Sequence, residues 1–219
     1  MKVVEKFVSI NGEGSKAGQL AVFIRFAGCN LDCVYCDTKW ANEEDVSYLE
    51  MSKEEIYEYI KNTGVKNITV TGGEPLLQDG IYEFLEYLSL DKELSVEIET
   101  NGSVDISLFK KIDNTPSFTM DYKLDYSKME KKMFLDNLKK LDKRDVIKFV
   151  SGSQKDLEIL KNIVEKYNLI ERTKVYVSPV FGAIEPSVIV DWMIDNNLNG
   201  MNLQIQMHKI IWDPEKKGV

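Results

Sequence analysis

The sequence is poor in several residue types, and each scarcity excludes a class of protein. It contains only three cysteines and a single histidine, His208, among 219 residues. The cysteines all lie between residues 29 and 36, so they cannot form the disulfide framework of a small secreted domain. Free thiols indicate a reducing compartment, and we therefore expect the cytoplasm. No apolar run approaches the length of a membrane span, and the first residues lack the apolar core of a signal peptide.

Positive charge is also scarce. The chain carries 28 Lys and Arg against 36 Asp and Glu, which gives a formal net charge of -8 at pH 7. Because nucleic-acid binding needs a basic surface, we expect no nucleic-acid partner. The composition is otherwise ordinary, with 43% hydrophobic and 29% charged residues. We find no internal repeat, low-complexity tract or linker, and the length suits one sizeable domain over residues 1–219.

The cysteines are the most informative feature that is present. Cys29, Cys33 and Cys36 follow a C-x3-C-x2-C spacing, with Tyr35 just before the third cysteine. Three thiolates on one loop can bind three irons of a 4Fe-4S cluster, which leaves the fourth iron without a protein ligand. An open metal position is where a substrate or cofactor binds. The alternatives are a structural zinc site, for which the distant His208 is a poor fourth ligand, or unrelated buried cysteines.

The cysteine spacing resembles the signature of the radical S-adenosyl-L-methionine (SAM) enzymes. A second motif agrees: a β-branched strand over 67–71 runs into Gly72-Gly-Glu-Pro75, which resembles the G-G-E-P motif whose backbone meets the amino group of SAM. The resemblance implies that SAM chelates the open iron of the cluster. Reduction of the cluster then cleaves SAM to a 5′-deoxyadenosyl radical, which abstracts a hydrogen atom from the substrate. The cofactor supplies this chemistry, and the protein supplies binding and orientation.

Strands and helices alternate along the chain, which is typical of a parallel sheet covered by helices. Strands are predicted over 2–9, 20–27, 67–71, 94–99, 117–121, 145–151, 173–178 and 201–206. Helices are predicted from the capping box at Ser52 and Glu55 to Gly64 and over 80–89, 105–112, 129–141, 153–167 and 186–197. About six βα units are two short of a closed eightfold barrel. We therefore expect an α/β fold: a compact, incomplete, open-sided (β/α)6 TIM-like barrel of the radical SAM type, with an added N-terminal strand.

The helix predicted over 129–141 depends on a stripe of apolar residues, which we interpret as core packing. Active residues of such barrels lie at the C-terminal ends of the strands. By these strand assignments, that end collects the cysteine loop, Gly72-Gly73, Thr100-Asn101, Asp121–Lys123, Ser151 and Ser178.

Two further features of the N-terminal part leave alternatives open. Arg25 interrupts the apolar strand over 20–27, and a buried arginine needs an anionic partner. That partner is either a protein carboxylate or a carboxylate on a substrate. The glycines of Ser9-Ile-Asn-Gly-Glu-Gly-Ser15 form either a plain hairpin turn, which the pattern alone favours, or a turn whose backbone approaches a ligand.

Four segments resemble the 7-carboxy-7-deazaguanine synthases within the radical SAM enzymes. They are Ser9-Ile-Asn-Gly-Glu-Gly14, the stretch F-I-R-F-A-G-C around Arg25, Cys36-Asp-Thr38, and Leu203-Gln-Ile-Gln-Met-His208-Lys. The resemblance spans nearly the whole chain. It implies a carbon–nitrogen lyase that converts 6-carboxy-5,6,7,8-tetrahydropterin to 7-carboxy-7-deazaguanine and ammonia, in the pathway to queuosine and other 7-deazapurines. The reaction starts with hydrogen abstraction at C6 and requires Mg²⁺.

The same resemblance implies roles for individual residues. The three cysteines hold the cluster, Thr38 supplies an oxygen to magnesium, and no side chain serves as a catalytic group. A hard ion such as Mg²⁺ takes few protein ligands and completes its shell with substrate and water. Residues expected to contact the substrate are Ile10, Asn11, Gly12, Glu13, Arg25, Thr71 and His208. Residues expected to contact SAM are Tyr35, Cys36, Asp37, Gly73, Asp121, Tyr122, Lys123 and Ser178.

Some positions depart from the family pattern. Asp121-Tyr-Lys123 stands where the family has S-P-K, Ser178-Pro stands where it has Q-P, and Asn11 replaces glutamine. For His208, a substrate contact and a packing role remain equally open. The expected partners are the pterin substrate, an electron donor such as flavodoxin or ferredoxin, and a second copy of the chain in a homodimer. Two other functions remain: a glycyl-radical activase, which acts on a partner protein, and a non-enzymatic metal-binding protein.

Overall fold

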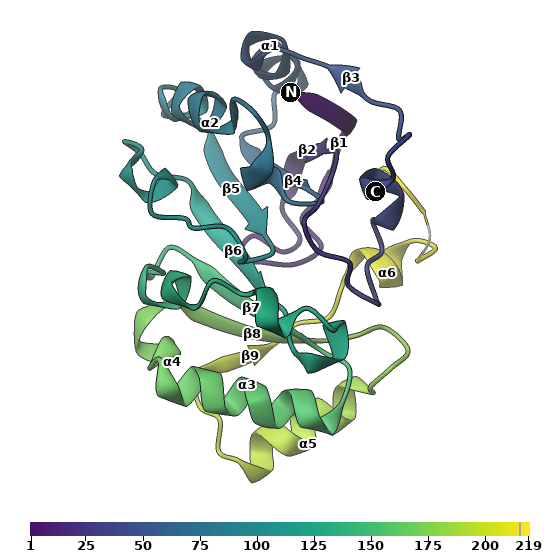
Figure 1. The fold of residues 1–219 in the computed structure, drawn as a ribbon, viewed down its shortest axis with the longest axis vertical. Coiled ribbons are helices and arrows are strands. Elements are labelled where there is room, and N and C mark those ends of the chain that lie inside the picture. The colour runs from purple at the N-terminus through teal and green to yellow at the C-terminus, as the bar shows by residue number, and fades with distance from the viewer. Residues whose placement is uncertain (215) are drawn as a thin grey trace.

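One mixed sheet organises the molecule. The computed structural model describes residues 1–214 and 216–219. Its strands are β1 (Lys2–Ile10), β2 (Leu20–Phe26), β3 (Leu49–Glu50), β4 (Asn67–Gly72), β5 (Ser95–Thr100), β6 (Ser117–Tyr122), β7 (Val146–Ser151), β8 (Lys174–Pro179) and β9 (Met201–Leu203). They form a nine-stranded sheet in the order β3-β1-β2-β4-β5-β6-β7-β8-β9 (Figure 1). From β2 through β4 to β9 the neighbours are parallel, whereas β1 pairs antiparallel with both β2 and β3.

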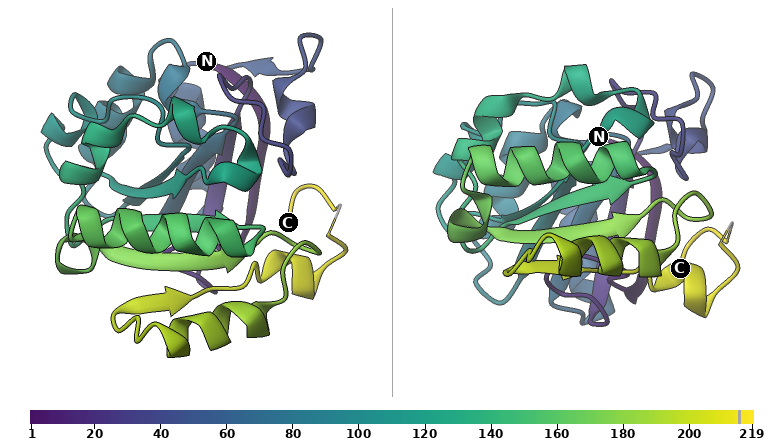
Figure 2. Two further views of the ribbon diagram at one scale, coloured as in Figure 1. Left: turned by 60° about the horizontal axis from the view of Figure 1, so that its bottom comes forward. Right: turned by 90° about the horizontal axis from the view of Figure 1, so that it is seen from below.

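The helices are α1 (Lys53–Thr63), α2 (Ile81–Ser89), α3 (Gln154–Lys166), α4 (Leu169–Arg172), α5 (Pro186–Asp195) and α6 (His208–Ile211). Short 3-10 turns are η1 (Lys39–Asn42), η2 (Pro75–Leu77), η3 (Phe109–Lys111), η4 (Asp125–Ser127), η5 (Glu130–Lys132) and η6 (Leu135–Lys139). The sheet curves, so that β1, β2 and β8 point in clearly different directions (Figure 2). Its two edges, β3 and β9, do not pair with each other. The predicted α/β fold, an open and incomplete barrel with an added N-terminal strand, is confirmed. No helix in the described part of the chain is long and apolar enough to cross a bilayer.

Two predicted helices are wrong. Over 105–112 only η3 forms, because the Asp105 carboxylate accepts hydrogen bonds from the backbone and the hydroxyl of Ser107. Such local bonds compete with helix formation. Over 129–141 the chain forms η5 and η6 in place of an α-helix. Buried Asn137 donates to the carbonyls of Gly102 and Val104, and these contacts override the helical period.

Alternation along the parallel strands separates an apolar face from a polar one. The face toward the helices carries the buried apolar core, including Ile68, Val70, Ile98, Phe118, Met120, Ile147 and Phe149. The residues between them have polar or charged side chains: Thr69 and Thr71, Glu97 and Glu99, Thr119 and Asp121, and Lys148. The barrel interior is therefore polar, which prepares it for a polar ligand.

Candidate active site

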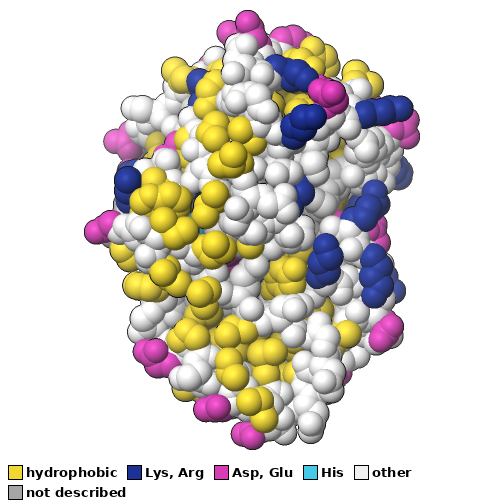
Figure 3. Space-filling view, turned by 180° about the vertical axis from the view of Figure 1, so that it is seen from behind, with side chains coloured by type: hydrophobic (Ala, Val, Ile, Leu, Met, Phe, Trp, Pro, Cys, Tyr) yellow, Lys and Arg dark blue, Asp and Glu magenta, His cyan; other side chains and the backbone are white. Residues whose placement is uncertain are grey.

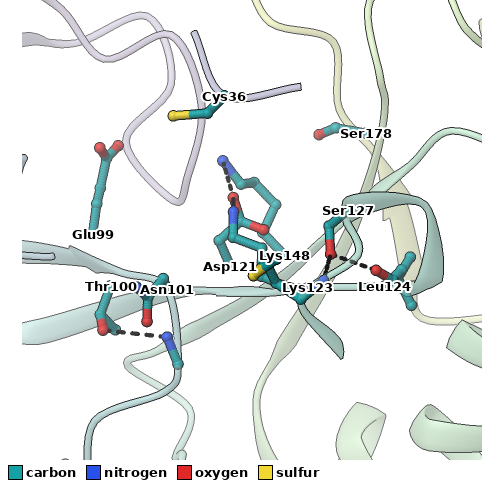
Figure 4. Close-up of polar contacts among 12 residues, drawn as sticks. Cys36, Glu99, Thr100, Asn101, Asp121, Lys123, Leu124, Ser127, Lys148 and Ser178 are labelled. Atoms are coloured by element: carbon teal, nitrogen blue, oxygen red, sulfur yellow. Dashed lines mark hydrogen bonds and ion pairs between the residues drawn. The ribbon is translucent and has the colours of Figure 1, made fainter. Parts of the chain in front are cut away.

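A cavity of about 700 Å³ opens at the C-terminal ends of the parallel strands. All three cysteines line it, and Figure 4 shows Cys36 and Glu99 reaching into the same space above Asp121 and Lys123. Most of the predicted site residues line it too: Ile10, Gly12, Glu13, Arg25, Tyr35, Asp37, Thr38, Thr71, Gly73, Asp121, Lys123 and His208. Asn11, Tyr122 and Ser178 do not.

The three thiols fit the ligands of an iron–sulfur cluster. Cys33 is buried, Cys29 and Cys36 are partly buried, and all three are free. Burial raises the pKa of Cys33 to about 11 and also raises that of Cys29, so that metal binding must drive their deprotonation. No three His, Cys, Asp or Glu side chains among the described residues are arranged to hold one metal ion. Three thiols on one loop suit a cluster, which spreads its ligands over several irons.

The glycines after β4 let two loops touch. The amides of Gly73 and Glu74 donate to the carbonyls of Phe26 and Gly28, at 3.2 and 2.9 Å. A Cβ atom on Gly73 would lie 2.1 Å from the carbonyl oxygen of Gly28 and 2.2 Å from Oδ1 of Asn42. Only glycine fits there, and its bare backbone borders the cavity beside the cysteine loop.

Glu74 fixes this loop to the end of β5. Its fully buried carboxylate accepts bonds from the amides of Leu76 (3.0 Å) and Asn101 (2.7 Å) and from the Thr100 hydroxyl. Burial is the largest influence on this group, and it raises the pKa of Glu74 to about 7. Sequence reasoning noted Glu74 only as part of a motif and assigned it no role.

Two lysines and two carboxylates lie at the floor of the cavity. Lys123 Nζ is 2.9 Å from Asp121, while Lys148 Nζ is 3.1 Å from Glu13 and 3.7 Å from Asp121. Oδ1 of Asp121 is buried and has no hydrogen-bond partner among the described residues. Next to three thiols, a free carboxylate oxygen and an ammonium group can bind the amino and carboxylate groups of an amino-acid moiety. Lys148 was not predicted, although it is the one charged residue within the buried strand β7.

Glu13 links four segments of the chain. Its carboxylate accepts hydrogen bonds from Lys148 (3.1 Å), Ser178 (3.1 Å) and Gln206 (3.2 Å). Burial alone would raise the pKa of Glu13, but the charge of Lys148 and the hydrogen bonds from Gln206 and Lys148 outweigh it, so the pKa is lowered. The side chain of Ser178 therefore faces Glu13. Tyr122 packs against Phe149 in the core, with ring centroids 5.4 Å apart.

Arg25 finds its anionic partner within the protein. Its Nε lies 3.0 Å from Glu5, which is its cross-strand neighbour in the β1–β2 pair. Both side chains line the cavity, so the pair can still present a guanidinium group to a ligand. Thr71 donates to Glu99 at 2.8 Å. Asn11 accepts from Thr69 at 2.7 Å, and its buried Nδ2 has no partner among the described residues.

The C-terminal segment from Gln204 to His208 contacts the N-terminal glycine loop at Gly12 and Gly14. Gln204 accepts from the amide of Gly14 (2.8 Å) and donates to its carbonyl (3.1 Å). The amide of Met207 donates to the carbonyl of Gly12, and a Cβ atom on Gly12 would lie 2.3 Å from Nδ1 of His208. The predicted hairpin is present, because residues 11–19 join the antiparallel strands β1 and β2, but it is not a plain turn, since Glu13 reaches Lys148 and Ser178 inside the barrel. His208 packs on Gly12 and also lines the cavity, and burial lowers its pKa.

Thr38 places its hydroxyl beside the cluster loop, where its one hydrogen-bond partner among the described residues is the Cys36 thiol. Its Oγ1 lies 3.6 Å from Sγ of Cys36 and lines the cavity. The residue is the N-cap of η1, yet its side chain makes no capping hydrogen bond. The oxygen is thus available to a cation. Its neighbour Asp37 forms an ion pair with Lys209 at 3.2 Å, which joins the cluster loop to α6.

Comparisons with known proteins agree with this geometry. The Radical SAM superfamily model matches residues 23–151. The chain is 65% identical over 218 residues to a 7-carboxy-7-deazaguanine synthase of Clostridium acetobutylicum, covering 100% of this chain and 99% of that one. It is 32% identical to another from Chlorobaculum tepidum, covering 100% and 97%. The crystal structure of QueE from Escherichia coli superposes with a TM-score of 0.74 at 24% identity, over 94% of each chain, which establishes the similarity of fold.

Proposed function

Since this chain belongs to the 7-carboxy-7-deazaguanine synthase family of the radical SAM superfamily, we propose that it converts 6-carboxy-5,6,7,8-tetrahydropterin to 7-carboxy-7-deazaguanine with loss of ammonia. The supporting observation is that three free thiols, the bare Gly72-Gly73 backbone and the Asp121–Lys123 pair border one cavity. When bound, the 4Fe-4S cluster and SAM supply the 5′-deoxyadenosyl radical that removes a hydrogen atom from C6.

The residues of the cavity divide between cofactor and substrate. Cys29, Cys33 and Cys36 hold the cluster. We assign the amino and carboxylate groups of SAM to the Gly73 backbone and the Asp121–Lys123 pair, because Asp121 keeps a buried oxygen without a partner. The other expected SAM contacts are Tyr35, Asp37, and the backbone at Tyr122 and Ser178.

The substrate side of the cavity lies between the N-terminal loop and β2. There the Arg25 guanidinium and a magnesium ion on Thr38 are placed to orient the substrate carboxylate and neutralise its charge. The loop from Ile10 to Glu13, together with Thr71 and His208, borders the pterin ring. Glu13 is ionised at neutral pH and holds Lys148 there as a cation, so the substrate meets a fixed charge pattern.

The partners follow from this chemistry. The cluster needs a one-electron donor, for which flavodoxin or ferredoxin is suited. We propose that the chain acts as one radical SAM unit over residues 1–219 and forms a homodimer in the cytoplasm. Exposed apolar side chains on the back of the molecule support the dimer (Figure 3). The three free thiols support a reducing compartment.

Anaerobic turnover by the reconstituted protein tests the proposal. The assay contains SAM, dithionite, Mg²⁺ and 6-carboxy-5,6,7,8-tetrahydropterin, and chromatography follows 7-carboxy-7-deazaguanine, ammonia and 5′-deoxyadenosine. We expect all three products, and the Cys33→Ala variant should make none. Deoxyadenosine formed without the deazaguanine would reject the substrate and leave the activase alternative. An intact cluster that SAM does not perturb would reject the radical SAM assignment itself.

A further inference from the structure

A basic surface borders the cluster loop of this acidic protein. It consists of Lys128, Lys131 and Lys132, which are exposed, around the exposed apolar side chains of Val34, Phe134 and Leu135. We call this set the lysine surface. Val34 lies between two of the cysteines and is 54% exposed. The chain as a whole carries a net charge of -8, so this local excess of lysine differs from the rest of the molecule.

Hydrogen bonds make the lysine surface continuous with the cluster loop. The amide of Val34 donates to the carbonyl of Ser127 at 3.3 Å, directly before Lys128. The amide of Phe134 donates to the carbonyl of Gly102 at 3.1 Å. Next to it, Nδ2 of Asn101 lies 3.5 Å from Sγ of Cys29. The segment that carries the lysine surface is therefore joined directly to the loop that holds the cysteines.

The three lysines are not engaged in ion pairs. Within the described residues, many other lysines are paired, such as Lys61 with Asp91, Lys139 with Asp136 and Lys155 with Asp125. None of Lys128, Lys131 and Lys132 forms an ion pair with any described residue. Lys128 acts through space on Asp125, whose pKa it helps to lower, and Glu130 precedes the other two lysines, so lysine is in excess on this surface without being its only charge.

The backbone conformation at Lys128 also indicates a functional position. Its φ is 66°, in the left-handed region that glycine and asparagine adopt more readily. A lysine there costs about 1 kcal/mol of backbone strain. A position that tolerates this cost and exposes its charge beside a metal-binding loop is a candidate for function.

We propose that the lysine surface docks an acidic one-electron carrier protein, which supplies the electron for SAM cleavage. This inference rests on the proposed function. The reduced carrier loses one electron, and SAM is finally reduced as its C5′–S bond breaks to give methionine and the deoxyadenosyl radical. An apolar centre with a charged rim suits a small, transient redox interface. Opposite charges on the two proteins speed their encounter and orient it.

Binding of purified flavodoxin to the reconstituted enzyme tests the proposal directly. The test variant is Lys128→Asn/Lys131→Gln/Lys132→Gln, in which asparagine keeps the left-handed backbone at 128. The matched control is Lys92→Gln/Lys111→Gln/Lys174→Gln. These three lysines are also exposed and in no ion pair with a described residue, but Lys92 and Lys111 precede β5 and β6 and Lys174 begins β8, at the opposite end of the sheet. Both variants change the net charge equally.

We expect the test variant to weaken flavodoxin binding by about tenfold or more at low salt, with a flatter salt dependence of Kd. The flavodoxin concentration that gives half-maximal 5′-deoxyadenosine formation should rise in parallel. The control variant should keep the wild-type Kd. With dithionite as reductant, which needs no docking, all three proteins should form deoxyadenosine at the same rate.

An unchanged Kd in the test variant would overturn the docking surface, as would an equal loss in the control variant, since net charge alone would then explain binding. Binding lost together with dithionite-driven deoxyadenosine formation would also overturn it, because the damage would lie in the cluster. If the wild-type protein forms no deazaguanine with dithionite, the proposed function fails. The Kd comparison still decides the docking surface in that case.

Discussion

At the scale of single residues, the site is a balance of buried charges. Lys148 stands between Glu13 and Asp121, and Asp121 also pairs with Lys123. The desolvation cost of burying an ion pair cancels much of the free energy gained from the attraction between the charges. Removing one member, however, leaves the other charge buried without a partner. The network is therefore better understood as fixing positions in the cavity than as adding stability.

This view predicts the outcome of a double-mutant cycle. Lys148→Met should destabilise the folded protein by about 3 kcal/mol, because the Glu13 carboxylate is left buried without its cation. Adding Glu13→Gln removes that charge, so the double variant should lose clearly less than the sum of the two single variants. Urea unfolding of the anaerobic protein measures each free energy. Lys174→Met, at an exposed lysine, is the control and should change little. Strictly additive losses would show that the two side chains are not coupled.

The hydroxyl of Thr38, which faces the cavity beside Cys36, leads to a second prediction. Thr38→Ala should raise the Mg²⁺ concentration for half-maximal turnover by roughly 10- to 100-fold, the range typical of weakened metal sites. Thr38→Ser keeps the oxygen and should behave like the wild type. The iron–sulfur absorption spectrum serves as the control, since η1 gains no capping bond from this side chain. A serine variant as impaired as the alanine variant would remove the oxygen from the magnesium site.

How far the sequence predicts the site depends on whether a residue's role is local. The cysteines, Gly73 and Thr38 belong to short motifs, and the structure brings them to one cavity. Lys148 and Glu5 gain their roles from partners across the fold, so no motif marks them. One signal was available for Lys148: like Arg25, it is a lone charge in an apolar strand. Such a charge implies a buried anionic partner.

At the scale of elements, the sequence predicts a helix correctly where an N-cap residue marks its start. The Ser52–Glu55 capping box is present at the start of α1, and Ser153 caps α3 by accepting from the amide of Asp156. The segment over 129–141 shows the limit. Its Met133 and Leu138 are buried as predicted, whereas Phe134 of the same apolar stripe is exposed, because Asn137 binds the loop after β5 and the backbone turns to follow it. Periodicity reports which side is buried, and not the path of the chain.

The loop after β4 predicts a pH dependence of stability. The pKa of Glu74 is raised by burial to about 7 in the folded protein. Because the folded state binds this proton more tightly than the unfolded state, protonation of Glu74 favours folding. The contribution is complete below the unfolded pKa of about 4.3, and it is lost as the pH rises through 7. Between about pH 5.5 and pH 8 the free energy of unfolding should fall by about 2 kcal/mol on this account.

Glu74→Gln is uncharged at all pH values and should lose that slope. The measurement is urea unfolding at both pH values, with Glu93→Gln as the control because Glu93 is 69% exposed at its side chain. The control should keep the wild-type slope. A Glu74→Gln variant with an unchanged slope would place the pH dependence in other groups.

At the scale of the whole molecule, the open barrel is completed by the two ends of the chain. The N-terminal loop enters the barrel from one side, and the segment from Gln204 to His208 closes over it. The C-terminal part of the chain also carries apolar side chains that are partly exposed. Figure 3 shows apolar side chains gathered on the back of the molecule. The exposed apolar residues of α5, of α6 and of the segment between β9 and α6 include Val190, Ile194, Ile205, Ile210 and Ile211.

A monomer rarely leaves so extended an apolar face in water, and a second copy of this chain is the partner we propose for it. Val190 and Ile194 are four residues apart on α5 and thus share a face, with Ile194 66% exposed. The wild type should sediment as a dimer, and Val190→Asp/Ile194→Asp should shift it to monomer because two charges cannot be buried unpaired. Leu90→Asp is the control: Leu90 is 74% exposed, follows α2 and lies outside this face, so the dimer should persist. A wild type that sediments as a monomer would assign the apolar face to another partner.

Since that face adjoins the segment that carries His208, dissociation of the dimer should also raise KM for the pterin. An unchanged KM in the monomeric variant would show that dimer formation does not affect the substrate site.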